Sequence, residues 1–157
     1  MKNVVKYGLQ PFEMNVLEPS RTICEKIMSL VRFSYTENPI VDLKNKIRHA
    51  YDIHQLLQQE EFKIFIESEG FKEMLLKVAN DDVSSFKNNN EWLAYHPNDS
   101  LFFKNLDEIW ENELKDIYLN EFKNLVYGEL PEENKVLECL KQLKEGMSKI
   151  DWKISLE

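Results

Sequence analysis

The spacing of apolar and polar positions along the chain indicates α-helices over most of its length. Apolar residues recur at intervals of three and four, which is the period of a helix with one buried face. The predicted helices lie at residues 20–35, 41–58, 60–67, 71–80, 106–128 and from Pro131 to about 150. We therefore expect a mainly α fold, a compact bundle of about six helices.

The first two predicted helices are joined by a short break at residues 36–39. Ser20 is the predicted N-cap of the first helix, because its hydroxyl can accept a free backbone N–H. So short a connection favours an antiparallel pair. Further along, the polar stretch 80–100 is predicted to be an ordered loop held by Trp92 and Tyr95.

The first 19 residues differ from the rest, because they show little helical periodicity. Residues 13–17 alternate as a short strand does, and Pro19 ends the alternation. A single strand needs a partner for its backbone groups, and no convincing second strand follows. We expect an N-terminal segment over residues 1–19 and a single helical domain over residues 20–157.

Composition agrees with one globular domain, and the charge is distributed unevenly. Apolar residues make up 43% of the 157 and charged residues 31%, as in ordinary folded proteins. Residues 1–60 hold eight Lys or Arg against seven Asp or Glu, a net of +1, while residues 61–157 hold twelve against twenty-one, a net of −9. Because phosphate attraction dominates nucleic-acid binding, we expect any phosphate-facing surface in the first third, within residues 20–57.

Cysteine use and hydropathy indicate a reducing compartment. Cys24 and Cys139 are far apart, and each lies in an apolar helical pattern, so both are predicted to be buried thiols. The N-terminus lacks the apolar core of a signal peptide, and no apolar run has the length of a membrane span. We expect a cytoplasmic protein without membrane contact.

The second predicted helix carries the charged residues that could bind phosphate. Lys44, Arg48 and Asp52 are four residues apart and are predicted to share one face. They form either a solvated face with a weak ion pair or a stripe toward a phosphate-bearing ligand. Lys26, on the flank of the first helix, either extends along the surface or reaches Arg48 and Asp52 across the helix pair. Such groups assist phosphoryl transfer electrostatically.

Motifs of other catalytic sites are absent from the sequence. The histidines His49, His54 and His96 lack metal-ligand spacing with cysteines or carboxylates, so we predict no metal site. His54 lies on the predicted core stripe and is expected to be a buried histidine with satisfied hydrogen bonds. The chain has no glycine-rich phosphate loop and no G-x-S-x-G elbow.

Two short motifs resemble a known family. The helix E-K-I-x-S-L-x-R, followed by K-I-R-H-A-Y-D-I-H-Q-L-L, is similar to the C-terminal half of the AbiEii/AbiGii-type nucleotidyltransferases. These are the toxins of abortive-infection and type IV toxin–antitoxin systems. The resemblance covers roughly residues 10–60, and His49 stands where the family often has aspartate. The residues that match the motifs are Glu25, Lys26, Arg32, Arg48, Tyr51 and Asp52.

The resemblance implies roles for four of these residues. Lys26 would contact nucleotide phosphates and take part in the reaction, and Asp52 would assist catalysis. Arg48 and Arg32 would support nucleotide binding. It also implies that the strand at residues 13–17 is left over from the sheet of a nucleotidyltransferase core.

The resemblance also shows what this sequence lacks. The family is similar to the DNA polymerase β superfamily, where a G-S motif and a D-x-D pair bind the magnesium ions that hold the triphosphate. The chain has only the adjacent Asp81 and Asp82, which would project in different directions. We therefore expect a C-terminal helical part that is inactive alone. The NTP, magnesium and an RNA acceptor would belong to the complete enzyme.

Two partner hypotheses follow from this interpretation. A separate nucleotidyltransferase core or an antitoxin would complete the system. Alternatively, the chain is a non-enzymatic helical interaction module that acts as a homodimer or larger oligomer, or within a complex, through its acidic face and the strand at residues 13–17.

Overall fold

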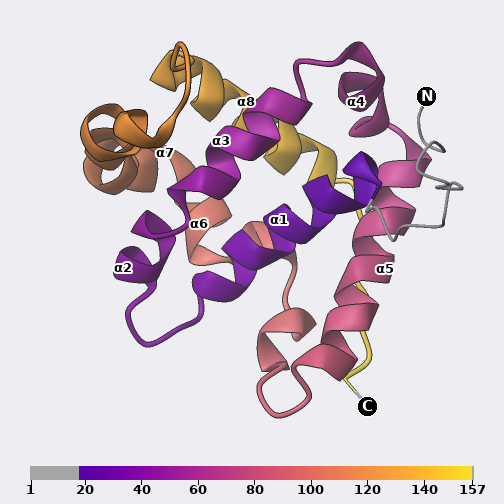
Figure 1. The fold of residues 1–157 in the computed structure, drawn as a ribbon. Helices are drawn as coiled ribbons and strands as arrows, with labels where there is room; N and C mark the ends of the chain where they lie inside the picture. Colours follow the sequence, from indigo (N-terminus) through magenta and orange to yellow (C-terminus); the bar gives the residue numbers. More distant parts are fainter. Residues whose placement is uncertain (1–17, 157) are drawn as a thin grey trace, which may run out of the picture.

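The computed structural model describes residues 18–156, and these are mainly helical (Figure 1). The predicted mainly α class is confirmed. The predicted strand at residues 13–17 lies outside the described residues, so the remnant of a sheet is not shown. No helix within residues 18–156 is long and apolar enough to cross a membrane. The α-helices are α1 (Pro19–Phe33), α2 (Pro39–Lys44), α3 (Ile47–Leu56), α4 (Glu60–Phe65), α5 (Glu69–Ser85), α6 (Leu101–Lys104), α7 (Leu106–Ile109) and α8 (Glu133–Met147).

Helix α1 is the element around which the others are arranged. Its residues Ile23, Ile27 and Leu30 are fully buried, and Figure 1 shows α3 along one side of it and α5 along the other. Removal of this apolar stripe from water stabilises the packing of α1 against its neighbours. The charged residues on the flanks of α1 are therefore held at two helix–helix boundaries.

The start of α1 differs from the prediction. Its N-cap is Glu18 and its first residue is Pro19, so Ser20 is not the N-cap. The fixed φ of proline and its missing N–H suit the first helical position. The Ser20 hydroxyl instead donates to the Glu18 carboxylate at 3.2 Å.

The single helix predicted over residues 41–58 is wrong. The segment forms two helices, α2 and α3, which a turn at Asn45 and Lys46 separates. No glycine or proline marks this break, and tertiary contacts outweigh the helical propensity there. Lys44 pairs with Glu113 at 3.5 Å, while the Lys46 ammonium lies 4.9 Å from the centre of the Phe33 ring.

The predicted antiparallel arrangement is confirmed for α1 and α3. The His49 Nε2 atom lies 3.1 Å from Ser29 Oγ, and the Lys26 Nζ atom lies 3.1 Å from Asp52 Oδ2. Moving three residues back along α1 thus moves three residues forward along α3, which only an antiparallel pair allows. Polar residues of the two motifs are thereby brought face to face.

The second half of the chain has less regular helices than predicted. Helix α7 continues through the π-helical turns η3 (Trp110–Leu114) and η4 (Ile117–Glu121) into the 3₁₀ turn η5 (Phe122–Leu125), and so ends before Gly128. Helix α8 has Glu132 as its N-cap, so Pro131 lies outside it. Pro131 takes part in a tertiary hydrogen bond instead, because its carbonyl accepts the Tyr118 hydroxyl at 2.7 Å.

The prediction of a loop over residues 80–100 is wrong in part. Helix α5 continues to Ser85, and two 3₁₀ turns follow, η1 (Glu91–Ala94) and η2 (Pro97–Asp99). Trp92 is buried and its indole N–H donates to the Asn89 carbonyl at 2.9 Å. Tyr95 is exposed, so it does not hold this segment by burial.

Buried cysteines and the core histidine agree with the predictions. Cys24 and Cys139 are free, buried thiols, and burial raises the pKa of both. His54 is buried, with Nδ1 3.1 Å from the Gln55 amide oxygen and Nε2 3.1 Å from the Gln58 amide nitrogen. Both ring nitrogens are satisfied, so this histidine has a structural role.

Candidate functional site

A lysine and an aspartate from different motifs form an ion pair across the α1–α3 boundary. The Lys26 Nζ atom lies 3.1 Å from Asp52 Oδ2, and the two side chains are 22% and 24% exposed. The alternative in which Lys26 only extends along the surface is therefore wrong. A half-buried pair restricts both side chains more than a surface pair does, and it keeps the ammonium in one place.

Arg48 joins this pair from the solvent side. Its Nε atom lies 3.7 Å from the same Asp52 oxygen, and its side chain is 64% exposed. Lys44 does not belong to the group, because the break between α2 and α3 turns it toward Glu113. The predicted stripe of Lys44, Arg48 and Asp52 is therefore reduced to a cluster of Lys26, Arg48 and Asp52, which we call the α3-side cluster.

His49 lies beside the α3-side cluster and is neutral at pH 7. Burial, together with the charges of Lys26 and Lys46, lowers its pKa to about 4. Its Nε2 atom contacts the Ser29 hydroxyl, while its Nδ1 atom is buried without a partner among the described residues. With His49 uncharged, the two cations and one carboxylate of the cluster leave one positive charge facing solvent.

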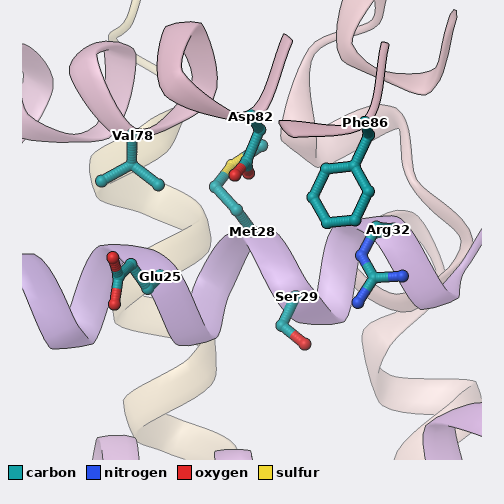
Figure 2. Close-up of a pocket in the computed structure, with 7 residues that line it drawn as sticks. All are labelled: Glu25, Met28, Ser29, Arg32, Val78, Asp82 and Phe86. Atoms are coloured by element: carbon teal, nitrogen blue, oxygen red, sulfur yellow. The ribbon is translucent and has the colours of Figure 1, made fainter. Parts of the chain in front are cut away.

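Arg32 lies away from this cluster, on the side of α1 that faces α5. Its guanidinium carbon is 4.3 Å from the centre of the Phe33 ring and 4.5 Å from that of Phe86. Figure 2 shows Arg32 beside a cavity of about 210 Å³ between α1 and the end of α5. The residues that line the cavity are Glu25, Met28, Ser29, Arg32, Val78, Asp82 and Phe86.

Asp82 is the carboxylate with the most perturbed environment in this cavity. Burial raises its pKa to about 6, and the nearby Arg32 opposes this rise only in part. Its neighbour Asp81 points elsewhere and accepts a hydrogen bond from Arg21 at 2.9 Å. The prediction that Asp81 and Asp82 project in different directions is confirmed.

A second cavity begins where the first ends, at Arg32. It measures about 200 Å³ and is rich in aromatic side chains. Tyr35 and Tyr95 stack there with ring centres 6.2 Å apart and planes inclined by 16°. The lining residues are Arg32, Tyr35, Thr36, Asn89, Glu91, Trp92 and Tyr95.

A comparison with protein families finds one match. The model of a family described as the nucleotidyl transferase AbiEii toxin of type IV toxin–antitoxin systems matches residues 2–149. The chain belongs to this AbiEii family. The match extends well beyond residues 10–60, where the short motifs lie. Comparisons with curated proteins and with solved structures found no match.

Membership of the AbiEii family raises the question of magnesium, which we test on the side chains present. Within residues 18–156, no three His, Cys, Asp or Glu side chains lie close enough together to hold a metal ion. Asp52 already has the two cations Lys26 and Arg48 as neighbours, and their positive charges disfavour binding of a metal cation there. The described part of the chain does not fit this ion, and no step proposed below involves it.

Three of the four predicted site residues of this AbiEii chain come together, namely Lys26, Arg48 and Asp52. Arg32 does not join them. The Arg32–Asp82 cavity could not be inferred from sequence, because the two residues are fifty positions apart and Asp82 lies outside the motif that contains Arg32. The only available signal was an aspartate on an otherwise apolar helix flank.

Proposed function

We propose that this AbiEii chain forms the nucleotide-holding helical part of a nucleotidyltransferase toxin, which transfers nucleotides from an NTP to an RNA acceptor. Residues 20–157 would act as one helical domain. The observation that carries the proposal is the α3-side cluster of Lys26, Arg48 and Asp52. Its residues come from both family motifs, and the family itself is that of nucleotidyl transferase toxins.

In this proposal, Lys26 and Arg48 bind the triphosphate. Lys26 is partly desolvated and held in position, so its attraction to phosphate oxygens is stronger than that of a free surface lysine. Arg48 is exposed and can move from the Asp52 carboxylate to a phosphate. Arg32, which lies outside this cluster, would not contact the same triphosphate.

Asp52 has two tasks in the proposal. It keeps the Lys26 ammonium in place through the 3.1 Å ion pair. Once phosphate draws the two cations away, its carboxylate becomes available to accept a proton from the attacking hydroxyl. Both tasks need an ionised carboxylate.

We further propose that the chain is inactive alone and acts with partners. The described residues do not provide the carboxylate cluster of a metal-dependent transferase. A nucleotidyltransferase core, on this or another chain, would supply it. The type IV toxin–antitoxin family also suggests an antitoxin partner.

The binding test is a calorimetric titration of the chain with each of the four NTPs. Lys26→Ala should weaken binding of the preferred NTP by about tenfold or more, since a charge-assisted phosphate contact is lost. The matched control is Lys72→Ala, because Lys72 is a half-buried lysine that pairs with Glu69 at 3.5 Å elsewhere on the fold. Equal loss in both variants, or no NTP binding by the wild type, would contradict the proposal.

An activity test separates binding from transfer. The chain is incubated with magnesium, labelled NTP and RNA, and we expect no labelled RNA. Transfer by the chain alone would show that it has a complete active site and would overturn the proposed dependence on a separate core.

The alternative function, a helical interaction module, has one observation in its favour. Leu125 and Tyr127 are largely exposed around the end of η5, and exposed apolar residues of this size are frequent in interfaces. Light scattering with and without NTP tests it. A dimer that Tyr127→Ser disrupts, together with absent NTP binding, would favour this alternative.

A further inference from the structure

Nearly all of the excess negative charge of the chain lies in one segment, residues 107–133. This segment holds nine Asp or Glu against two Lys, a net of −7, whereas the whole chain has a net charge of −8. Like charges so close together repel one another, and contact with an oppositely charged surface would relieve that repulsion. Five acids of the segment are exposed and form no ion pair with any residue from 18 to 156. These are Glu108, Asp116, Glu121, Glu129 and Glu132.

Two large apolar side chains project from the same segment. Leu125 and Tyr127 are the most exposed large apolar residues within residues 18–156, at 72% and 103%. Tyrosine is enriched in protein–protein interfaces, because its ring buries a large area and has few rotatable bonds. The segment therefore combines the two components of a protein docking surface, an apolar anchor for affinity and charge for orientation.

The turn that presents Tyr127 is fixed on both sides. Val126, just before it, packs against the core. Gly128, just after it, has φ at +96°, a conformation that residues with a side chain rarely adopt. Beyond the turn, the Pro131 carbonyl accepts the Tyr118 hydroxyl at 2.7 Å. A turn that is already fixed loses little conformational entropy when a partner binds, so the exposed ring is presented in advance.

The first part of the segment is one continuous helical run, from α7 through η3 and η4 to η5. Its buried residues Trp110, Leu114 and Tyr118 recur every four positions, so the opposite side of the run stays exposed. Figure 1 shows this run on the other side of the fold from α5. Both η3 and η4 are π-helical, a rare geometry that is frequent at functional sites. We call the exposed side of this run, with the turn that follows it, the 107–133 surface.

We propose that the 107–133 surface docks a protein partner with a basic surface, into whose apolar pocket Tyr127 inserts. Complementary charge selects this occupant. A nucleic acid is repelled by the local net charge of −7, and a second copy of the chain would bring two acidic surfaces together. The inference goes beyond the proposed function. None of its residues belongs to the α3-side cluster, so either can fail without the other.

The test measures the fluorescence anisotropy of three labelled peptides during titration with the full chain. The first peptide alternates lysine with leucine, the second lysine with serine, and the third glutamate with leucine. We expect saturable binding of the lysine–leucine peptide at low salt, weaker binding of the lysine–serine peptide, and no binding of the glutamate–leucine peptide. Added salt should weaken the first complex, because part of its affinity is electrostatic.

Two triple variants test whether the position of the charge matters, since each removes three negative charges. The variant of the 107–133 surface should bind both lysine peptides severalfold more weakly. The matched control changes exposed acids of α4 and α5 that form no ion pair within residues 18–156, and it should bind as the wild type does. The first variant is Glu121→Gln with Glu129→Gln and Glu132→Gln, and the control is Glu60→Gln with Glu61→Gln and Glu73→Gln.

A single variant tests the apolar anchor. Tyr127→Ser should weaken binding of the lysine–leucine peptide by about tenfold and leave binding of the lysine–serine peptide unchanged. Ile64→Ser is the matched control, because Ile64 is 60% exposed on α4. All the substituted side chains are exposed, so each variant should fold as the wild type does.

Several results would overturn the inference. Absence of lysine–leucine binding would remove the basic partner. Equal losses in the two triple variants would show an effect of net charge alone, and undiminished binding by Tyr127→Ser would remove the anchor. Light scattering covers the remaining occupant, since a dimer of the chain that Tyr127→Ser disrupts would make the 107–133 surface a contact between two copies.

Discussion

Helix α1 separates two regions that use charged residues in opposite ways. On the α3 side, Lys26, Arg48 and Asp52 are gathered into a cluster in which each cation is already paired. On the α5 side, Arg32 has no ion pair with any residue from 18 to 156, and Asp82 has a raised pKa beside a cavity. Three motif residues thus form a preassembled ion cluster, whereas the cavity lies on the other face of α1, beside the motif residue Arg32.

The largest expected difference between the two sides is in the free energy of unfolding when the carboxylate of Asp52 or of Asp82 is removed. Asp52→Asn leaves Lys26 half-buried without its partner, so we expect a loss of about 1–3 kcal/mol in the free energy of unfolding. Asp82→Asn removes a carboxylate that burial disfavours, so stability at pH 7 should be unchanged or rise by up to about 1 kcal/mol. Urea unfolding of the purified variants measures both.

Asp107→Asn is the control, because its pair with Lys141 is largely exposed and should change stability by less than about 0.5 kcal/mol. If Asp82→Asn destabilised the protein as much as Asp52→Asn, the two sides would not differ as proposed.

A smaller contrast is expected in the pH dependence of stability. The pKa of His49 falls from 6.5 to about 4 on folding. Between these values the unfolded chain alone holds the proton, so this group makes stability rise with pH. The pKa of Asp82 rises from 3.8 to about 6. Here the folded chain alone holds the proton, so stability falls as pH rises from about 4 to 6.

Single variants separate the two opposing terms. His49→Gln should remove the increase in the free energy of unfolding between pH 4 and 6.5, and Asp82→Asn should remove the decrease between pH 4 and 6. Each change should amount to about 1–2 kcal/mol, because one pKa unit corresponds to 1.36 kcal/mol and partial exposure reduces the effect. The measurement is urea unfolding at pH 4.5 and 7. Parallel curves for both variants and the wild type would refute these assignments.

The smallest expected effect concerns Arg48. Its contact with Asp52 is 3.7 Å and its side chain is mostly exposed, so Arg48→Gln should change stability by less than about 0.5 kcal/mol. NTP binding should still weaken severalfold if the α3-side cluster holds phosphate. Thermal unfolding measures the stability of Arg48→Gln, and a calorimetric titration measures its affinity for NTP. Unchanged NTP binding would exclude Arg48 from the proposed site.

The periodicity of the sequence was sufficient to locate most helices and the pairing of the first two. It failed at Asn45, where no glycine or proline marks the break, and at the end of α5, where residues 81–85 remain helical although all but Val83 are polar. In both places contacts between distant residues outweigh local preference. An antiparallel pair made the Lys26–Asp52 contact possible, but the sequence left it open beside a Lys26 that extends along the surface, and the structure decided between them.

The sequence by itself determined the mainly α class, the buried cysteines and the family, because periodicity and motifs are local properties of the chain. Only the tertiary structure decided that Lys44 lies apart from the cluster, and that Arg32 lines one cavity with Asp82 and another with Tyr35 and Tyr95. The physical reason is that ion pairs and cavities depend on distances between residues far apart in sequence. Those distances exist only once α3 and α5 pack against α1.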